Sequence, residues 1–563
     1  MKNLYYMASV LVVLFCLSLL DKFFILIALL LSLLLFITYM YFVSRKRKLS
    51  VLTIVYVGFS FSFVAYAVST ILNSNNFITH SFVTLLILSV ITPTFFLLAY
   101  RIVLSIHCFI DSMFFLNVAS VESDPLAEKQ GCSIVITTRN EPFDVCKMTF
   151  DSAYDLDYPS NLKEIIVVDN SELSHDDFIK WQRYANEKNM LDGIKCKFIH
   201  RDGTEGFKPR NLDIAMESVS FNYVLFLDAD STLPKDALSV GMPEFSKDSK
   251  LGFVSFLIES TNYEMNLVTK VTSIFQNTIR YFNEFVGKNG YCNYQGHNGV
   301  WSVEALQATS KWEEYHKDQV MVTEDIAAGF RCYAAGFISK PIFLKTGEWV
   351  PTSLKEFEKM WLRWSFGGMQ VMHKYLVTII KSRNLYFRVK LDMLYLLFKV
   401  VASGFPLFAL LLVIFPRSDM GFVVVVNFTL LPLIILSVWY YMFGYIRGGF
   451  FSKIGQIYMA MFMLSSFVFW CGIKAEINYY LNKSQRWKPT SKIFEKNDSW
   501  AAVLYSHVGK LVFSLVGLIL AVVSIFRFFP SDDFALYVFC MIPSMLLFLN
   551  TILCVLILGR VKT

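Results

Sequence analysis

Apolar residues are concentrated at the two ends of the chain, and a more polar stretch separates them. Residues 1–110 and 390–563 are mostly apolar, whereas residues 120–385 mix short apolar runs with polar segments, as soluble domains do. A helix needs about 20 apolar residues to cross a hydrocarbon core of ~30 Å. The pattern therefore predicts membrane helices on both sides of a globular domain.

Eight apolar stretches have a length and composition suited to membrane spans, four before the globular domain and four after it. They are Tyr5–Leu20, Phe23–Phe42, Val51–Leu72, Phe82–Ile106, Leu391–Phe415, Phe422–Phe443, Leu511–Phe528 and Phe534–Leu558. A ninth stretch, Ile454–Leu481, is also apolar, but a basic loop follows it. That loop favours a helix lying at the cytoplasmic interface, with a spanning helix as the alternative.

Basic residues give the predicted orientation. The segments "SRKRK" at 44–48, "YIRGGFFSK" at 445–453 and "GRVKT" at 559–563 flank predicted spans, and the loops on the opposite side carry little positive charge. Positive residues stay on the cytoplasmic side of a membrane. We therefore expect a multi-pass protein of the plasma (inner) membrane, with the globular domain and both termini in the cytoplasm.

The globular stretch contains four short apolar runs that alternate with helical patterns. The runs are Cys132–Thr138, Glu164–Asn170, Lys195–Arg201 and Tyr223–Asp230. Continuous apolar strands alternating with helices are typical of a parallel sheet covered on both faces. Ligands of such sheets bind beyond the carboxyl ends of the strands. Asp169, Asp228 and Asp230 stand at such ends, so this edge is the predicted site.

The sequence "FLDAD" places Asp228 and Asp230 two residues apart where a buried strand turns into a loop. Two carboxylates in this arrangement can converge on one hard cation, and Mg²⁺ and Mn²⁺ prefer oxygen ligands that include substrate phosphates. The prediction is an Mg²⁺ or Mn²⁺ ion that holds a diphosphate. The alternative is a solvated acidic turn.

Composition narrows the possible class of protein further. The chain has 563 residues, 55% hydrophobic and 17% charged, below the quarter that is usual in soluble domains. Membrane-edge basic segments account for much of the net charge of +7, so nucleic-acid binding is not expected. The ten cysteines form no CxxC pair, which indicates neither a disulfide framework nor a zinc site.

Six segments in order carry a family resemblance: "SIVITTRNEP", "VVDN", "GFKPRN", "FLDAD", "TEDIAAGFRCYAAG" and "WLRW". Together they resemble the processive membrane family-2 glycosyltransferases, the group of cellulose, hyaluronan and chitin synthases, and are closest in motifs to bacterial β-glucan synthases. The resemblance implies an α/β fold plus membrane helices. A cytoplasmic nucleotide-sugar transferase domain of the GT-A type would be inserted between two bundles of transmembrane helices.

The resemblance also implies roles for individual residues. Asp325 of the "TED" segment matches the general base, and Asp230 matches the metal ligand. The residues implied to bind the nucleotide sugar are Thr138, Asn140, Glu141, Asp169, Lys208, Asp228 and Arg363. A separate interpretation of "VTED" is a helix start capped by Thr323, with acidic residues in the first turn; both interpretations can hold together.

Acceptor contacts are implied for His297 and Asn298 of the "GHN" segment, Glu324 and Trp364. In the "MWLRW" segment Met360 stands where the family has glutamine, which leaves part of the acceptor contact unaccounted for. "RWKPTSK" at 486–492 resembles the gating loop of cellulose synthase, with Trp487, Thr490 and Lys492 at the matching positions. The alternative for this segment is a basic loop beside the membrane.

The predicted organisation follows from these patterns and the resemblance. It comprises four transmembrane helices in 1–110, the transferase domain in 120–350, interface helices with the RW motif in 351–390, two spans in 391–446, an interface helix in 453–483, a gating loop in 484–500 and two spans in 509–558.

The predicted function is a processive inverting polysaccharide synthase. It would transfer sugar from a UDP-sugar, with UDP-glucose as first choice, to a growing β-glucan and secrete the polymer through its own channel. A sugar hydroxyl must lose a proton as it attacks, and a carboxylate can accept that proton. The expected partners are the UDP-sugar, the polysaccharide acceptor and the lipid bilayer, with room for an accessory secretion protein. The alternatives are a hyaluronan- or chitin-type synthase, a non-processive transferase onto a lipid carrier, and a transporter or scaffold with a degenerate domain.

Overall fold

The computed structural model describes residues 130–287, 291–398, 410, 449–483, 499–527 and 534–560. The first four predicted spans, the predicted span Phe422–Phe443 and most of Leu391–Phe415 lie outside the described residues. So do the predicted gating residues Trp487, Thr490 and Lys492.

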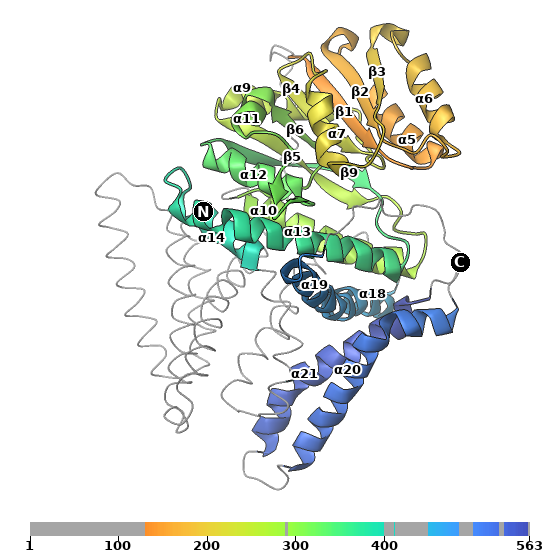
Figure 1. Ribbon diagram of the computed structural model, residues 1–563, viewed down its shortest axis with the longest axis vertical. Helices are drawn as coiled ribbons and strands as arrows, with labels where there is room; N and C mark the ends of the chain where they lie inside the picture. The colour runs from red at the N-terminus through yellow and green to blue at the C-terminus, as the bar shows by residue number, and fades with distance from the viewer. Residues whose placement is uncertain are drawn as a thin grey trace. The chain divides into compact units, whose positions relative to one another are not determined.

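A seven-stranded sheet organises the globular domain, in the order β3-β2-β1-β4-β6-β5-β9 (Figure 1). Its strands are β1 (Cys132–Thr138), β2 (Lys163–Asp169), β3 (Lys195–His200), β4 (Tyr223–Asp228), β5 (Leu251–Ser260), β6 (Gly299–Ser302) and β9 (Ile338–Glu348). A separate hairpin pairs β7 (Tyr315–His316) with β8 (Gln319–Val320).

The four predicted strands are confirmed, with ends that differ by no more than two residues. The four predicted strands are parallel to one another, as expected. The complete sheet is mixed, because β6 runs antiparallel to both β4 and β5, while β5 and β9 are parallel to each other. β6 is only four residues long, and the sequence pattern of so short a strand does not identify it.

Strand register brings the polar strand ends to one edge. Thr138 pairs with Asp169, Thr137 with Asp228, and Asp169 with His200. Because β1 to β4 are parallel, these residues all lie at the carboxyl edge of the sheet, the usual position of a ligand site in such folds.

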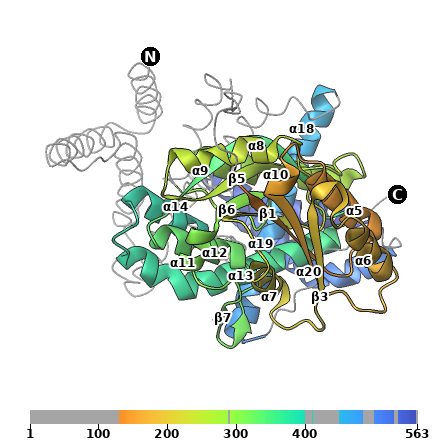
Figure 2. The same cartoon turned by 90° about the horizontal axis from the view of Figure 1, so that it is seen from above.

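Helices pack on the sheet through apolar faces at helical spacing. In α5 (Phe143–Tyr154) the buried residues Cys146, Phe150, Ala153 and Tyr154 form one face. Phe150 is fully buried and meets Trp181 of α6 (Phe178–Glu187) edge-on, with ring centroids 5.8 Å apart. In Figure 2, α5 and α6 lie beside the β1 and β3 end of the sheet, and α11 and α12 beside the β6 end.

The globular domain contains further helices among its described residues. They are α7 (Phe207–Met216), α8 (Ala237–Gly241), α9 (Pro243–Lys247), α10 (Leu267–Gly287), α11 (Val303–Ala308), α12 (Glu324–Ala334), α13 (Leu354–Lys381) and α14 (Phe387–Phe398). The long helix α13 starts at Ser353, whose hydroxyl accepts a hydrogen bond from the backbone N–H of Glu356.

A second long helical segment packs on α13. It consists of α18 (Phe450–Tyr458), the π-helical η6 (Met459–Leu464) and α19 (Ser465–Tyr480). Figure 1 shows α13 between α12 and this segment. Tyr263, which precedes α10, donates a hydrogen bond from its hydroxyl to Gln456 Oε1 of α18 over 2.8 Å, so the segment is tied to the globular domain at both α13 and α10.

Two described helices have the length and composition to cross a membrane, 450–480 and α20 (Trp500–Arg527). Half of the apolar window of 450–480 is buried against the protein, but only 22% of that of α20. The shorter apolar stretch Ser544–Leu558 belongs to α21 (Phe534–Leu558). The chain divides into two compact units, and the one that holds the sheet comprises 117–393, 454–508 and 553–563.

Candidate active site

The acidic turn after β4 is held in place by the end of β9. Asp228 closes β4, and its backbone N–H donates to Ser231 Oγ over 3.1 Å. Asp230 Oδ2 accepts a hydrogen bond from the backbone N–H of Trp349 over 3.3 Å. Thr232 and Gly347 exchange two backbone hydrogen bonds of 2.8 and 2.9 Å. Both aspartates are therefore fixed on a braced turn, unlike the side chains of a solvated acidic loop.

Lys208 of α7 brings a positive charge to this turn. Its Nζ lies 2.5 Å from Asp228 Oδ1 and 3.9 Å from Glu324 Oε1, and donates to the carbonyl of Gly296 over 3.1 Å. Burial lowers the pKa of Lys208, but the charges of Asp228 and Glu324 outweigh burial, so the net shift of the pKa is upward. Lys208 is therefore a fixed cation, suited to an incoming diphosphate.

The first turn of α12 supplies two more carboxylates. Asp325 Oδ1 accepts a hydrogen bond from the backbone N–H of Ile326 over 2.8 Å. Burial, followed by the charge of Asp228, raises the pKa of Asp325, and burial raises the pKa of Glu324 to about 7. Each of these carboxyl groups is therefore a stronger base than an ordinary one, as proton abstraction requires.

Thr323 precedes α12, but its side chain does not cap the helix. The predicted threonine cap is wrong, because the side chain packs against α13 instead. A Cβ added to Gly367 would lie 2.4 Å from Thr323 Cγ2. Gln370 of the same helix accepts from the backbone N–H of Val322 over 3.0 Å. The contacts to α13 therefore set the position of the "TED" segment.

The "GHN" segment requires glycine at position 296, for reasons of both backbone conformation and space. Its φ is +87°, and a Cβ there would lie 3.2 Å from Asp325 Oδ2. A side chain would be both strained and too close to the carboxylate. The glycine thus lets the loop backbone pass directly beside Asp325.

Helix α13 contributes Arg363 and Trp364. The charges of Glu324, Asp228 and Asp325 act on Arg363, whose pKa burial lowers without removing its charge. Trp364 is partly buried and meets Trp361 edge-on at 5.1 Å. Arg363 therefore belongs to the same charged cluster as Lys208, although the two residues come from different helices, α13 and α7.

Asp169 lies in a closed network at the neighbouring strand end. It is fully buried, and its carboxylate accepts from Thr138 Oγ1 over 2.7 Å and from the N–H and hydroxyl of Ser171 over 2.9 and 2.8 Å. His200 Nδ1 lies 3.3 Å away. The network ties β1, β2 and β3 together. A contact between Asp169 and the nucleotide sugar stays a prediction.

Asn140, in the loop after β1, has a φ of +49°. Its Oδ1 accepts from the backbone N–H of Glu172 over 2.9 Å, and its own N–H donates to Ser171 Oγ over 2.7 Å. Glu141 follows and is partly exposed. This loop is therefore pinned to the β2 end, and nucleotide contacts by Thr138, Asn140 and Glu141 also stay predictions.

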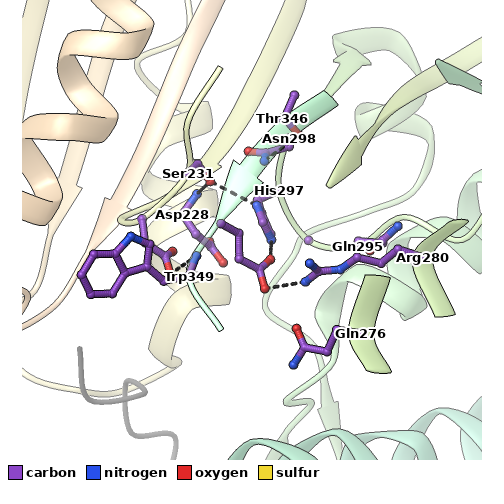
Figure 3. Close-up of polar contacts among 12 residues, drawn as sticks. Asp228, Ser231, Gln276, Arg280, Gln295, His297, Asn298, Thr346 and Trp349 are labelled. Carbon is purple, nitrogen blue, oxygen red and sulfur yellow. Dashed lines mark hydrogen bonds and ion pairs between the residues drawn. The ribbon is translucent and has the colours of Figure 1, made fainter. Parts of the chain in front are cut away.

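His297 is buried beside the acidic turn (Figure 3). Its Nδ1 lies 3.1 Å from Ser231 Oγ, and its Nε2 lies 2.7 Å from Glu348 Oε2. Glu348 also pairs with Arg280 of α10. Burial would raise the pKa of Glu348, but Arg280 and His297 lower it to about 2. Both ring nitrogens of His297 thus face protein groups, an arrangement that supports the turn.

Asn298 has no exposed surface and a φ of +50°. Its Nδ2 donates to Thr346 Oγ1 over 3.0 Å and to the carbonyl of Gly347 over 3.2 Å. It therefore ties the start of β6 to β9. A predicted acceptor contact of His297 would require its bonds to Ser231 and Glu348 to open, whereas Asn298 Oδ1 has no hydrogen-bond partner among the described residues.

Several site residues are not signalled by the sequence. Ser231, Arg280, Glu348 and Trp349 meet around the acidic turn from β4, α10 and β9, but none stands in a motif of the predicted set. Only the tertiary structure shows that they belong to it.

The acidic side chains of the site offer few ligands for a metal ion. Within the described residues, no group of three or more His, Cys, Asp or Glu side chains could hold an ion. The ordered carboxylates of Asp228 and Asp230 therefore fit Mg²⁺ or Mn²⁺ only if substrate oxygens complete the coordination, which is usual for metal ions that carry nucleotides.

Comparison with known families agrees with this geometry. Residues 133–308 match the family described as "Glycosyl transferase family 2". This region is therefore similar to family 2 glycosyltransferases. Residues 223–470 match "Glycosyl transferase family group 2", so the similarity continues through α13 and into α19. The predicted enzyme class is confirmed at the level of this domain, and its α/β sheet agrees with the predicted nucleotide-sugar transferase fold.

A curated relative is "Probable glucomannan 4-beta-mannosyltransferase 14" of Arabidopsis thaliana, 26% identical over 312 residues. The match covers 53% of this chain and 56% of the plant protein, so the chain spans about half the length of the curated relative.

Two solved structures are also similar to this chain. The mannosyltransferase PcManGT from Pyrobaculum calidifontis, in complex with GDP-Man and Mn²⁺, is 15% identical with a TM-score of 0.43, and the match covers 69% of this chain and 99% of that one. TarS 1–349 of S. aureus is 12% identical with a TM-score of 0.33, over 65% and 94% of the two chains.

Proposed function

We propose that this protein is an inverting β-glycosyltransferase that extends a polysaccharide from a nucleotide-sugar donor. The observation that carries the proposal is the single cluster formed by Lys208, Asp228 and Asp325, with Glu324 and Arg363 beside them. It joins carboxylates for proton abstraction to cations for a diphosphate leaving group. A transporter or scaffold has no use for such a cluster.

Asp325 is the proposed base. Its carboxylate accepts the proton of the acceptor hydroxyl as that hydroxyl attacks the anomeric carbon. The bond from sugar to diphosphate breaks in the same step, and the developing charge lies beside Lys208 and Arg363. Asp228 and Asp230 would hold Mg²⁺ or Mn²⁺, which supplies further charge neutralisation when bound. A single displacement inverts the anomeric centre, so an α-linked donor gives a β-linked product.

UDP-glucose is the first donor that we propose, with a β-glucan as product, as the motif resemblance implies. GDP-mannose is a second candidate, because the Arabidopsis relative carries the name of a mannosyltransferase. The two donors differ in both nucleobase and sugar. Competition between UDP-glucose and GDP-mannose for the enzyme therefore shows which one it prefers.

We further propose that the reaction takes place at the cytoplasmic face of a membrane and that the product is secreted. The apolar helix α20 supports membrane association, since only 22% of its apolar window is buried in the protein. A gating role for Trp487, Thr490 and Lys492 belongs to the same proposal. The rival is transfer of a single sugar to a lipid carrier.

The test is incorporation of radiolabelled sugar by purified full-length protein. We expect polymer from UDP-glucose or GDP-mannose, digestible by a linkage-specific β-glucanase or β-mannanase, and no product from the Asp325→Asn variant. Product of constant size, soluble in organic solvent, would favour the lipid-carrier rival. Absence of any transfer or donor hydrolysis with both donors would overturn the proposal.

Secretion has its own test. Sealed vesicles with the transferase domain outside should collect polymer in the lumen when donor is added outside. Polymer found only outside intact vesicles would reject secretion while leaving the transferase assignment in place.

A further inference from the structure

The β7–β8 hairpin lies directly before the segment that carries Asp325. Its strands, Tyr315–His316 and Gln319–Val320, are antiparallel, and its turn residues Lys317 and Asp318 have φ values of +50° and +57°. A two-residue turn with both φ values positive matches the twist of the strands and joins them tightly. A displacement of this hairpin is therefore passed on to the residues that follow it, Asp325 among them.

The C-terminal end of α19 contacts the hairpin. Tyr479 is 2% exposed, and its hydroxyl lies 2.8 Å from His316 Nε2. Lys317 Nζ lies 4.1 Å from the centre of the Tyr479 ring, within the range of a cation–π interaction. Gln319 Nε2 donates to the carbonyl and to Oδ1 of Asn482, over 3.3 and 2.9 Å. Both strands and the turn of the hairpin are therefore attached to the end of α19.

His316 is suited to accept the hydrogen bond from the Tyr479 hydroxyl. Burial, followed by the neighbouring His373 and Lys317, lowers the pKa of His316. The imidazole is therefore neutral at pH 7, and a neutral imidazole has one nitrogen that accepts. The contact thus joins a phenol donor to a neutral acceptor in a partly buried position.

Helix α13 holds the other end of the hairpin, next to the "TED" segment. Gln370 is 1% exposed, its Oε1 accepts from the backbone N–H of Val322 over 3.0 Å, and its Nε2 donates to the carbonyl of Val320 over 3.1 Å. Lys374 Nζ donates to the carbonyl of Tyr315 over 2.7 Å. The strand that leads from the hairpin to Asp325 is therefore fixed by an amide of α13.

Tyr479 contacts both α13 and the hairpin. Its ring centre lies 4.7 Å from that of His373 and 6.0 Å from that of Phe366, both on α13, while its hydroxyl contacts His316. A change at this hydroxyl therefore acts on the hairpin, and through it on the strand that Gln370 holds. Small displacements matter at a reacting centre, because a misplacement of about 1 Å can cost ~10² in rate.

We propose that Tyr479 is a positioning residue for Asp325, which it holds in place through His316 and the β7–β8 hairpin. The inference rests on the proposed function, in which Asp325 is the base, and adds a determinant of its position on a distant helix. Tyr479 itself contacts no reacting atom. Its loss should therefore affect proton abstraction and leave the donor site at the strand ends unchanged.

The test compares Tyr479→Phe, which removes only the hydroxyl, with a matched control, Tyr480→Phe. Tyr480 is the next residue and is 64% exposed, and its hydroxyl lies 3.5 Å from His373 Nε2 of α13. The readouts on full-length protein are kcat, donor KM, the pH dependence of kcat, melting temperature, and amide hydrogen exchange of residues 314–327 followed by mass spectrometry.

We expect Tyr479→Phe to lower kcat by about 2- to 10-fold, the factor that corresponds to one net hydrogen bond. Donor KM and melting temperature should stay near their wild-type values. Amide exchange in residues 314–327 should accelerate by a similar factor, because the segment opens more often. Tyr480→Phe should leave all of these unchanged.

The pH dependence of kcat separates positioning from a general loss of folded protein. Burial is the main cause of the raised pKa of Asp325, and the charged groups that act on this residue are Asp228, Glu324, Lys208 and Arg363. A base held less firmly is better hydrated, so its pKa falls toward the ordinary value. The acid limb of the profile should therefore move to lower pH in Tyr479→Phe.

Wild-type kcat and exchange in Tyr479→Phe would overturn the positioning role. So would a lower kcat with unchanged exchange and an unchanged acid limb, since that result assigns Tyr479 to general stability. If Tyr479→Phe folds poorly, His316→Phe keeps a planar ring, removes the acceptor and gives the same decision. Absence of transfer and donor hydrolysis in the wild-type protein is a separate outcome, and it would overturn the transferase proposal itself.

Discussion

Lys208 Nζ lies 2.5 Å from Asp228 Oδ1, so a cation from α7 already contacts the acidic turn of β4. The two residues are 20 positions apart in the sequence, and the sheet brings them together. A diphosphate entering the site would exchange this partner for its own oxygens.

Lys208→Met should therefore weaken donor binding and slow transfer. Loss of one fixed cation at a developing charge costs about 10²–10³ in kcat, and the donor KM should rise as well. Lys208→Arg is the control that keeps the charge. Initial rates at varied donor concentration measure both values, and wild-type kinetics in the methionine variant would show that the pair only stabilises the fold.

Asp325→Asn should lower kcat by about 10²–10⁴ while donor binding is retained. Burial and the charge of Asp228 raise the pKa of Asp325. A base must be deprotonated, so the wild-type rate should fall with decreasing pH at a higher pH than an ordinary aspartate would give. Transfer rates measured from pH 5 to 9, together with donor titration, test these effects. Near-normal rates in the variant would show that Asp325 only stabilises the start of α12.

Activity should require Mg²⁺ or Mn²⁺, because Asp228 and Asp230 need substrate oxygens and a cation to complete the site. Excess chelator should abolish transfer, and either ion should restore it. Asp230→Ala should remain inactive at any metal concentration, whereas its melting temperature should stay near that of the wild type. Full turnover in excess chelator would contradict this prediction.

Glu348→Gln should destabilise the domain, since it leaves Arg280 without its carboxylate in a buried site. Breaking a buried pair costs about 3–5 kcal/mol. The pKa of Glu348 falls from 4.5 to about 2 on folding, so its contribution is complete above pH 4.5 and disappears as the pH falls toward 2. Denaturant unfolding at pH 7 and pH 3 should therefore show a larger difference between variant and wild type at pH 7.

Much of the domain is predictable from local sequence. Continuous apolar runs such as Cys132–Thr138 and Tyr223–Asp228 need burial on both faces, and the alternating helices provide it. The acidic positions Asp228 and Asp230 are predictable because the carboxyl ends of parallel strands mark where a ligand site forms, whereas the role of Asp325 is implied only by the family resemblance. The short antiparallel strand Gly299–Ser302 is not, since four residues carry too little periodicity to distinguish strand from loop.

Tertiary structure alone decides how the site is built. Thr323 precedes a helix as a capping residue does, yet its side chain accepts no cap hydrogen bond and packs against Gly367 of α13. His297 stands in a motif that suggests ligand contact, but both of its ring nitrogens face Ser231 and Glu348. Local sequence determines which segments form strands and helices, because periodicity and burial act over a few residues. Which polar atoms meet depends on contacts between segments far apart in the chain, and only the folded domain determines those.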